Sequence, residues 1–140
     1  MHSGSALLDL LERMRAASIA QDARRLAELY AEDAVHEFPF TTPGGPTRIE
    51  GRAAIADFLA TVYRSLPLRY TEYRTIAVHQ ASRTTLVVEQ EALGVNTETD
   101  ARFALPNIAV IRIDPTGLIV SFRDYANPVA VAEALGGALR

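Results

Sequence analysis

The chain has 140 residues, of which 49% are hydrophobic and 22% charged, and its formal net charge is −3. This balance is typical of one globular domain with a sizeable core, and it excludes disordered and fibrous proteins. All fourteen basic residues are arginine and cysteine is absent, which excludes lysine chemistry, thiol catalysis, disulfides and cysteine-based metal sites.

The first half of the sequence predicts three helices. Apolar residues at helical spacing indicate a helix over residues 5–21, a second over about 23–32 that Asp22 can cap, and a third over about 51–65. Between the last two, the stretch DAVHEFPFTTPGGPTRIEG predicts a short strand and then a loop punctuated by proline and glycine.

After Pro67 the sequence becomes rich in branched and aromatic residues, as strands are. Turn-forming stretches divide it into four predicted strands, at residues 68–80, 84–95, 102–114 and 118–125, and a short helix is predicted over 128–138. Helices followed by an antiparallel meander indicate an α+β fold in which helices cover one face of the sheet. No linker or repeat divides the chain, so residues 1–140 are predicted to form a single domain.

The sequence also bears on cellular setting and partners. Acidic and basic residues interrupt the only N-terminal stretch that could serve as a secretion signal, and no run of about 18 apolar residues is present. No basic block with interleaved aromatic residues is suited to nucleic acid. We therefore expect a cytoplasmic protein that binds neither membranes nor nucleic acid.

Candidate site residues come from the alternation of side chains along the predicted strands. Four of the predicted strands, the short early one and the last three, each have an apolar face that should look toward the helices and that carries one polar residue. These residues are His36, Gln90, Asn107 and Asp124. Because a buried carboxylate needs a partner or a polar cavity, we expect the four side chains to converge on one pocket.

The chemistry of these four residue types favours proton transfer. Asp124 would be the principal acid or base and His36 its partner, since imidazole and carboxylate can hold each other's proton near neutral pH. Asn107 and Gln90 could orient a substrate carbonyl or stabilise a developing oxyanion.

Structural explanations exist for each of these residues. His36 could be a satisfied core histidine, and Asn107 could mend a bulge after a proline. A slip of one residue would turn Glu89 and Glu91 inward in place of Gln90.

Asp124 likewise has a structural explanation. Its carboxylate could cap the helix that begins near Pro128, or it could pair with a neighbouring arginine.

Metal and cofactor sites are not expected. The remaining histidines, His2 and His79, have no spacing that would gather metal ligands. The sequence also lacks the glycine patterns that bind nucleotides.

Three sequence segments, and the order in which they occur, resemble the SnoaL-like branch of the nuclear transport factor 2-like superfamily. They are LAELYAEDAVHEF, IEGRAAIADFL and DPTGLIVSFRDYANP, and the resemblance spans nearly the whole chain. It implies a curved, mainly antiparallel sheet wrapped around three helices, forming a cone-shaped α+β barrel with an internal apolar pocket. Members of the superfamily include ketosteroid isomerase, polyketide cyclases, limonene epoxide hydrolase, dehydratases and domains without catalysis, so the fold alone does not decide function.

The resemblance also compares single positions. Met14, Phe38 and Ala109 stand where ketosteroid isomerase has its tyrosine and two aspartates, which disfavours that mechanism. The phrase RDY is similar to one in limonene epoxide hydrolase, whose catalytic aspartate corresponds to Asp124. The arginine of that enzyme's upstream Arg-x-Asp has no counterpart in VEQEA.

These observations predict a cofactor-independent acid–base enzyme of cyclase, isomerase, dehydratase or epoxide hydrolase type. Its substrate would be a small hydrophobic molecule such as a polyketide or terpenoid intermediate. The apolar wall of the pocket would consist of Phe38, Phe40, Phe103 and Phe122.

The alternative is a non-catalytic module of the same fold for small-ligand binding or dimerisation. A homodimer is expected in either case, because the second face of the sheet would expose Ile108 and Val110.

Overall fold

The computed structural model describes residues 3–41 and 44–136. Its helices are α1 (Ser3–Ile19), α2 (Ala23–Ala27), α3 (Arg52–Ser65) and α4 (Pro128–Ala134). Its strands are β1 (Tyr30–Glu37), β2 (Arg48–Glu50), β3 (Leu68–Gln80), β4 (Thr85–Asn96), β5 (Arg102–Ile113) and β6 (Ile119–Ala126).

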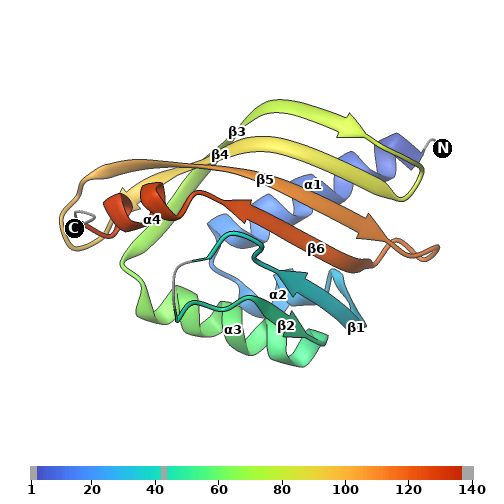
Figure 1. The fold of residues 1–140 in the computed structure, drawn as a ribbon, viewed down its shortest axis with the longest axis horizontal. Helices are drawn as coiled ribbons and strands as arrows, with labels where there is room; N and C mark the ends of the chain where they lie inside the picture. Colours follow the sequence, from blue (N-terminus) through green and yellow to red (C-terminus); the bar gives the residue numbers. More distant parts are fainter. Residues whose placement is uncertain (1–2, 42–43, 137–140) are drawn as a thin grey trace.

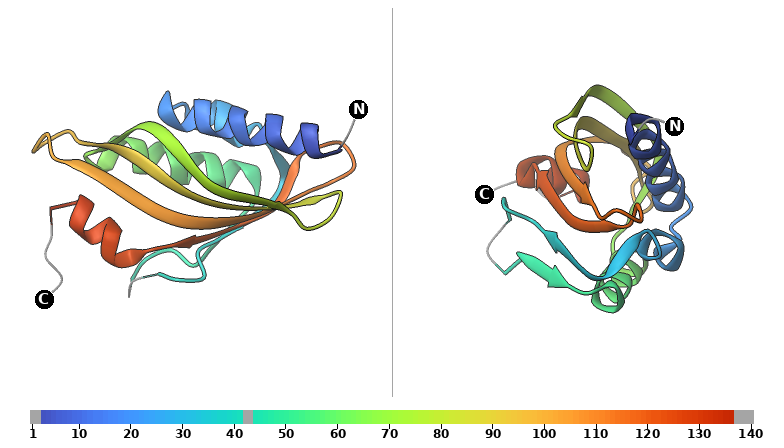
Figure 2. Two further views of the ribbon diagram at one scale, coloured as in Figure 1. Left: turned by 90° about the horizontal axis from the view of Figure 1, so that it is seen from above. Right: turned by 90° about the vertical axis from the view of Figure 1, so that its right-hand side faces the viewer.

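The strands form one curved sheet in the order β2-β1-β6-β5-β4-β3 (Figure 1). The sheet is antiparallel except where β1 runs parallel to β6. It curls without closing, and α1 and α3 lie along its concave side while α4 lies at one end (Figure 2). The predicted α+β cone, with a mainly antiparallel sheet wrapped around helices, is therefore confirmed.

The core lies between α1 and the concave face of the sheet. Leu7, Leu11 and Met14 recur at helical spacing on α1 and are buried. They pack with inward-facing residues of the central strands, which are Leu86, Val88, Ala109, Ile111 and Phe122. Period-2 alternation is complete along β4, where every second residue is buried. This strict alternation fixes which side chains of the central strands can reach the interior.

Two helix predictions need correction. Asp22 caps α2 as expected, its carboxylate accepting from the backbone N–H of Arg25 at 3.0 Å, but α2 ends at Ala27 rather than near residue 32. Tyr30 already belongs to β1, because pairing with β6 satisfies the backbone there and the sheet buries the ring. The last helix ends at Ala134, and residues 137 and 138 of its predicted span lie outside the described residues.

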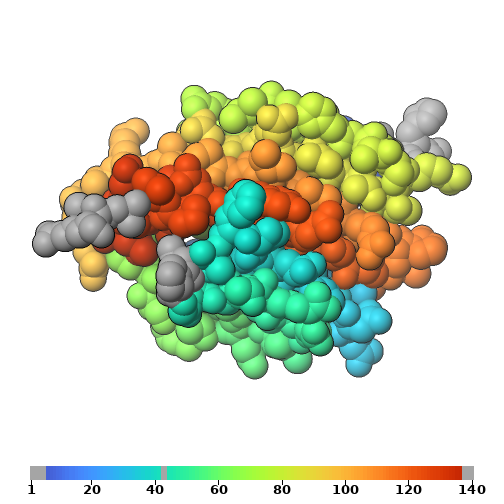
Figure 3. All heavy atoms as spheres, in the orientation of Figure 1, coloured from blue at the N-terminus to red at the C-terminus, as the bar shows by residue number. Residues whose placement is uncertain are grey.

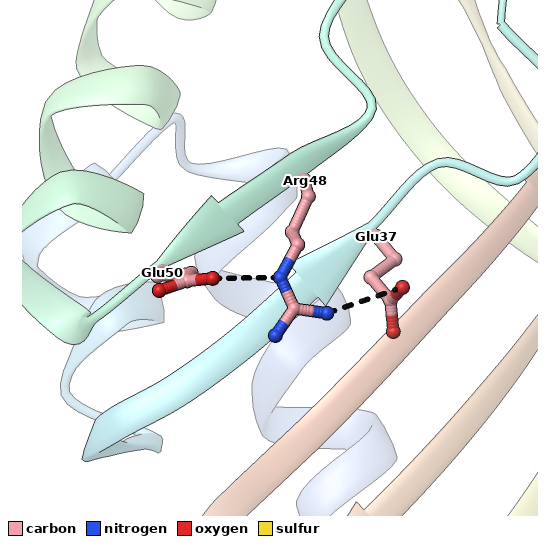
Figure 4. A network of polar contacts seen from close by, with 3 residues as sticks. All are labelled: Glu37, Arg48 and Glu50. Carbon is pink, nitrogen blue, oxygen red and sulfur yellow. Dashed lines mark hydrogen bonds and ion pairs between the residues drawn. The ribbon is translucent and has the colours of Figure 1, made fainter.

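The short strand β2 was expected to be loop. It pairs antiparallel with β1, from Val35↔Glu50 to Glu37↔Arg48. Arg48 contacts Glu50 at 2.7 Å and Glu37 at 3.5 Å (Figure 4). Arg48 and Glu50 are half or more exposed and Glu37 is partly exposed, so the ion pairs contribute little to stability and backbone pairing holds β2 in place.

Asn96, at the end of β4, fixes the position of α4. Its side-chain amide donates to the carbonyl oxygen of Ala134 at 3.0 Å, and its oxygen accepts from the backbone N–H of Glu98. The buried amide thus ties α4 to the sheet. None of the described helices is long and apolar enough to cross a membrane.

Candidate functional site

A cavity of about 500 Å³ lies between the concave face of the sheet, α1, α3 and α4. Most of its lining is apolar, including Leu11, Met14, Leu26, Phe58, Leu59, Val62, Leu105, Ile111, Val131 and Leu135. The four polar residues predicted from strand alternation, His36, Gln90, Asn107 and Asp124, all line it. A cavity of this volume and polarity suits a small, largely hydrophobic ligand.

Asp124 is the only carboxylate among the described residues that line the cavity. Strand β6 presents it inward, and the side-chain amide of Asn107 on β5 donates to its Oδ1 at 2.9 Å. Burial raises the pKa of Asp124, and the hydrogen bond from Asn107 opposes that rise. A neutral donor therefore holds the carboxyl group in place without neutralising its charge.

The purely structural roles considered for Asp124, a helix cap or an ion pair, and for Asn107, the repair of a bulge, do not apply. The cap of α4 is Asn127, whose Oδ1 accepts from the backbone N–H groups of Val129 and Ala130. Asp124 makes no ion pair within the described part of the chain. The register between β4 and β5 is continuous through Asn107, so its amide mends no bulge in that ladder.

His36 is buried, and its contact differs from the expected one. Its Nδ1 lies 3.0 Å from the hydroxyl oxygen of Tyr30, and no hydrogen bond joins it to Asp124 among the described residues. Strand register explains the difference, since His36 pairs with Phe122 and stacks on its ring at a centroid distance of 4.6 Å. Burial lowers the pKa of His36 to about 4, so the imidazole is neutral near pH 7.

The site also includes two tyrosines, Tyr30 and Tyr70, that strand alternation did not single out. The pKa of Tyr30 is raised by burial and by the charge of Asp124. The same two causes raise the pKa of Tyr70 to about 12. Both hydroxyl groups therefore stay protonated near Asp124. In the sequence these tyrosines look like ordinary core aromatics, so no local signal marks them.

Gln90 rather than its neighbours faces inward. Glu89 contacts His79 and Glu91 contacts Arg74, both on the outer side of the sheet. The side-chain oxygen of Gln90 accepts from Nε and Nη2 of Arg15 at 3.2 and 2.7 Å. Arg15 was not predicted as a site residue, because the apolar periodicity of α1 suggests that its charged residues point toward solvent.

The predicted aromatic wall is present in part. Phe38, Phe40 and Phe122 line the cavity, although Phe40 is 60% exposed and packs edge-on against Tyr125 at 5.4 Å. The described residues between β1 and β2 lie against β6 at this point of the surface (Figure 3). Phe103 is not a lining residue, because Tyr70 stands beside it at a ring distance of 6.0 Å.

Metal ligands are not gathered in the described part of the chain. No three or more of its His, Asp and Glu side chains are arranged to hold an ion.

Comparison with known proteins gives a family and a fold. The SnoaL-like domain family matches residues 11–122. The uncharacterized protein YesE of Bacillus subtilis is 35% identical over 129 residues, covering 92% of this chain and 86% of YesE. A crystal structure of a candidate isomerase from Bacillus subtilis is 31% identical, covers 99% of both chains and has a TM-score of 0.88.

A more distant structure carries a ligand. RV0760c from Mycobacterium tuberculosis, in complex with estradiol-17beta-hemisuccinate, is 18% identical with a TM-score of 0.72, covering 89% of this chain and 96% of that one. At this identity the likeness concerns the fold alone. The family match, the close relative and the cone around an apolar cavity together establish that this chain belongs to the SnoaL-like domain family of the nuclear transport factor 2-like superfamily.

Proposed function

We propose that this protein is a cofactor-independent acid–base enzyme acting on a small hydrophobic molecule, with Asp124 as the group that takes up and returns the proton. The observation that carries the proposal is a carboxyl group in an apolar cavity, held by the neutral amide of Asn107 and by no cation among the described residues. Its raised pKa brings the carboxyl group closer to the pH at which a general base works best.

The tyrosines supply the complementary part of the reaction. When Asp124 takes a proton from carbon next to a carbonyl group, negative charge develops on the carbonyl oxygen. A protonated hydroxyl group of Tyr70 or Tyr30 can donate to that oxygen in this mostly apolar cavity. His36 is then a positioning residue, since its contact with the Tyr30 hydroxyl group fixes where that group points.

Several reactions share this proton transfer. Isomerisation, cyclisation, dehydration and epoxide opening each need one group to move a proton in a dry site, and a polyketide or terpenoid intermediate would fit the apolar lining. Isomerisation is the simplest of these for the present geometry, because one carboxyl group can accept and return the same proton.

The test is deuterium exchange into 2-tetralone, a small bicyclic ketone with acidic α-protons, followed by NMR in D2O. We expect the wild-type protein to accelerate exchange and Asp124→Asn to lose at least about 100-fold of that acceleration. Asp114→Asn is the matched control, because Asp114 lies in an exposed turn and its loss should leave the rate within about twofold. An Asp124→Asn variant as active as wild type would refute the assignment.

The alternative function is a non-catalytic small-ligand-binding or dimerisation module. The volume of the cavity and the ligand carried by RV0760c favour this second candidate. Ligand binding without any exchange of 2-tetralone protons would put this alternative first.

We also propose that the protein forms a homodimer through the outer face of the sheet. This face carries a groove lined by Phe40, Ile76, Ile108 and Tyr125, of which Ile76 is 61% and Ile108 42% exposed. Large apolar side chains gathered in one groove are more stable against a second copy than in water.

A further inference from the structure

Arg15 reaches the cavity from α1 and is held there by two neutral groups. Its Nε and Nη2 atoms donate to the side-chain oxygen of Gln90, and its guanidinium carbon lies 5.4 Å from the ring centroid of Tyr73. The Tyr73 hydroxyl group in turn donates to Ser18 at 2.8 Å, which fixes the ring beneath Arg15. The guanidinium group is therefore placed by the surrounding side chains rather than free to turn into solvent.

No carboxylate contacts Arg15 directly. Arg15 makes no ion pair in the described part of the chain, and Glu12, one helical turn away and exposed, acts on it only through its charge at a distance. Burial lowers the pKa of Arg15, which reflects the cost of holding a cation in this position. An anion bound against the guanidinium group would offset that cost.

The guanidinium group also has donors to spare. It carries five N–H groups, and two of them are used on Gln90. The remaining donors include both nitrogens at the end of the side chain, which form the fork that binds a carboxylate through two parallel hydrogen bonds.

The position of Arg15 relative to Asp124 sets the length of a ligand that reaches both. Gln90 is the register partner of Asn107, and Asn107 donates to Asp124, so the polar groups form a row across β4, β5 and β6. Gln90, which Arg15 contacts, lies two strand spacings from Asp124, roughly 10 Å. A ligand with a two-ring body can span that distance.

We propose that Arg15 anchors a carboxylate of the ligand, so that this protein binds a small hydrophobic carboxylate anion with its apolar body against Asp124. This inference deepens the proposed function and rests on it for the role of Asp124. The competing explanation is that Arg15 only tethers α1 to β4, and the two differ in how binding responds to ligand charge.

The experiment compares two probes of equal shape, 2-naphthoate and 2-naphthamide, in calorimetric titrations at about pH 7, where the carboxylic acid is ionised. We expect wild type to bind naphthoate at least about tenfold more tightly than naphthamide, the ratio of one charge-assisted contact. Arg15→Met should lose this preference while its affinity for naphthamide stays within about twofold. Arg13→Met is the matched control, because Arg13 lies on the same helix, is exposed and pairs with Asp9.

Each result decides the question. Equal binding of the two probes by wild type, or no naphthoate binding at millimolar concentration, would overturn the proposal. So would an Arg15→Met variant that keeps the preference or loses both probes equally. If Arg15→Met does not fold, Arg15→Gln removes the charge while keeping a donor for Gln90, and the same outcomes apply. Naphthoate preference without 2-tetralone exchange would retain the anion site and put the non-catalytic binding module ahead of the acid–base function.

Discussion

The side-chain amide of Asn107 donates a 2.9 Å hydrogen bond to the carboxylate of Asp124 across two neighbouring strands. Asn107 is also the register partner of Gln90, whose oxygen accepts from Arg15. The polar residues of the cavity thus form one row, and its two charged ends are joined through neutral amides. Because an amide cannot neutralise a carboxylate, the ionisation of Asp124 should affect the stability of the fold.

Replacing Asp124 with asparagine should raise the free energy of unfolding at about pH 7. Its folded pKa is raised, so the native state binds more protons than the unfolded chain between the ordinary pKa of about 3.9 and the folded value. The free energy of unfolding of the wild type therefore falls as the pH rises through that window. The Asp124→Asn variant has no carboxyl group at this position, so its free energy of unfolding does not fall in this way. Denaturant unfolding at several pH values measures the difference. An Asp124→Asn variant less stable than wild type near neutral pH would contradict the prediction.

Asp114→Asn is a control for which we expect the opposite change in the free energy of unfolding. The hydroxyl group of Thr116 and backbone N–H groups donate to Asp114 and hold its pKa below the usual range. Its contribution to stability is present above the ordinary aspartate pKa and is lost as the pH falls through the folded pKa. The variant should be less stable near neutral pH, and that deficit should shrink in acid.

Acid should destabilise the protein through His36. Burial lowers its pKa from 6.5 to about 4, so the unfolded chain binds the proton more readily and stability falls by up to about 3 kcal/mol as the pH drops from about 6.5 to 4. His36→Phe should remove this pH-dependent part. Tyr30→Phe should keep it, because that change deletes the contacting hydroxyl group and leaves the imidazole in place. Unfolding curves of both variants that depend on pH alike would count against this account.

Gly94→Ala should destabilise the fold by about 2–3 kcal/mol or prevent folding. A methyl group there would press on the backbone carbonyl oxygen of Arg69 and lie 2.6 Å from Cζ of Phe103. Thermal unfolding of the variant measures the loss. Adding Phe103→Ala should not restore stability, because the backbone of β3 remains in the way; full rescue would show that only the ring is crowded.

Dimerisation should depend on the outer groove. Ile108→Arg places a charge among Phe40, Ile76 and Tyr125, and it should shift sedimentation at micromolar concentration from dimer to monomer. Arg83→Glu, a charge change in the exposed β3–β4 turn, is the control and should leave the dimer intact. A wild-type protein that sediments only as a monomer would refute the pairing.

Turnover should not require a metal ion. The groups in the described cavity that could bind a metal ion are one carboxylate, one neutral imidazole, amides and hydroxyl groups. They are a poor set of ligands for a divalent ion. Exchange of 2-tetralone protons should be unchanged after dialysis against a chelator. A metal bound in equal amount to the protein, whose removal abolishes exchange, would overturn the mechanism.

Alternation in the sequence was enough to predict which side chains of β4, β5 and β6 face the interior. The predicted strand over residues 68–80 agrees with β3, and the inward direction of Asn107 and Asp124 follows from alternation alone. Alternation is reliable here because the strands are long, one face of the sheet is buried, and a slip of one residue would expose every apolar side chain.

Which groups meet depends on how the elements pack against one another. The parallel pairing of β1 with β6 turned Tyr30 from a predicted helix into a strand and set His36 beside Phe122 instead of Asp124. Arg15 and Gln90 are 75 residues apart, yet they share two hydrogen bonds. Periodicity fixes the direction of a side chain relative to its own element, whereas its partner depends on which other element packs opposite, and that follows from burying the core as a whole.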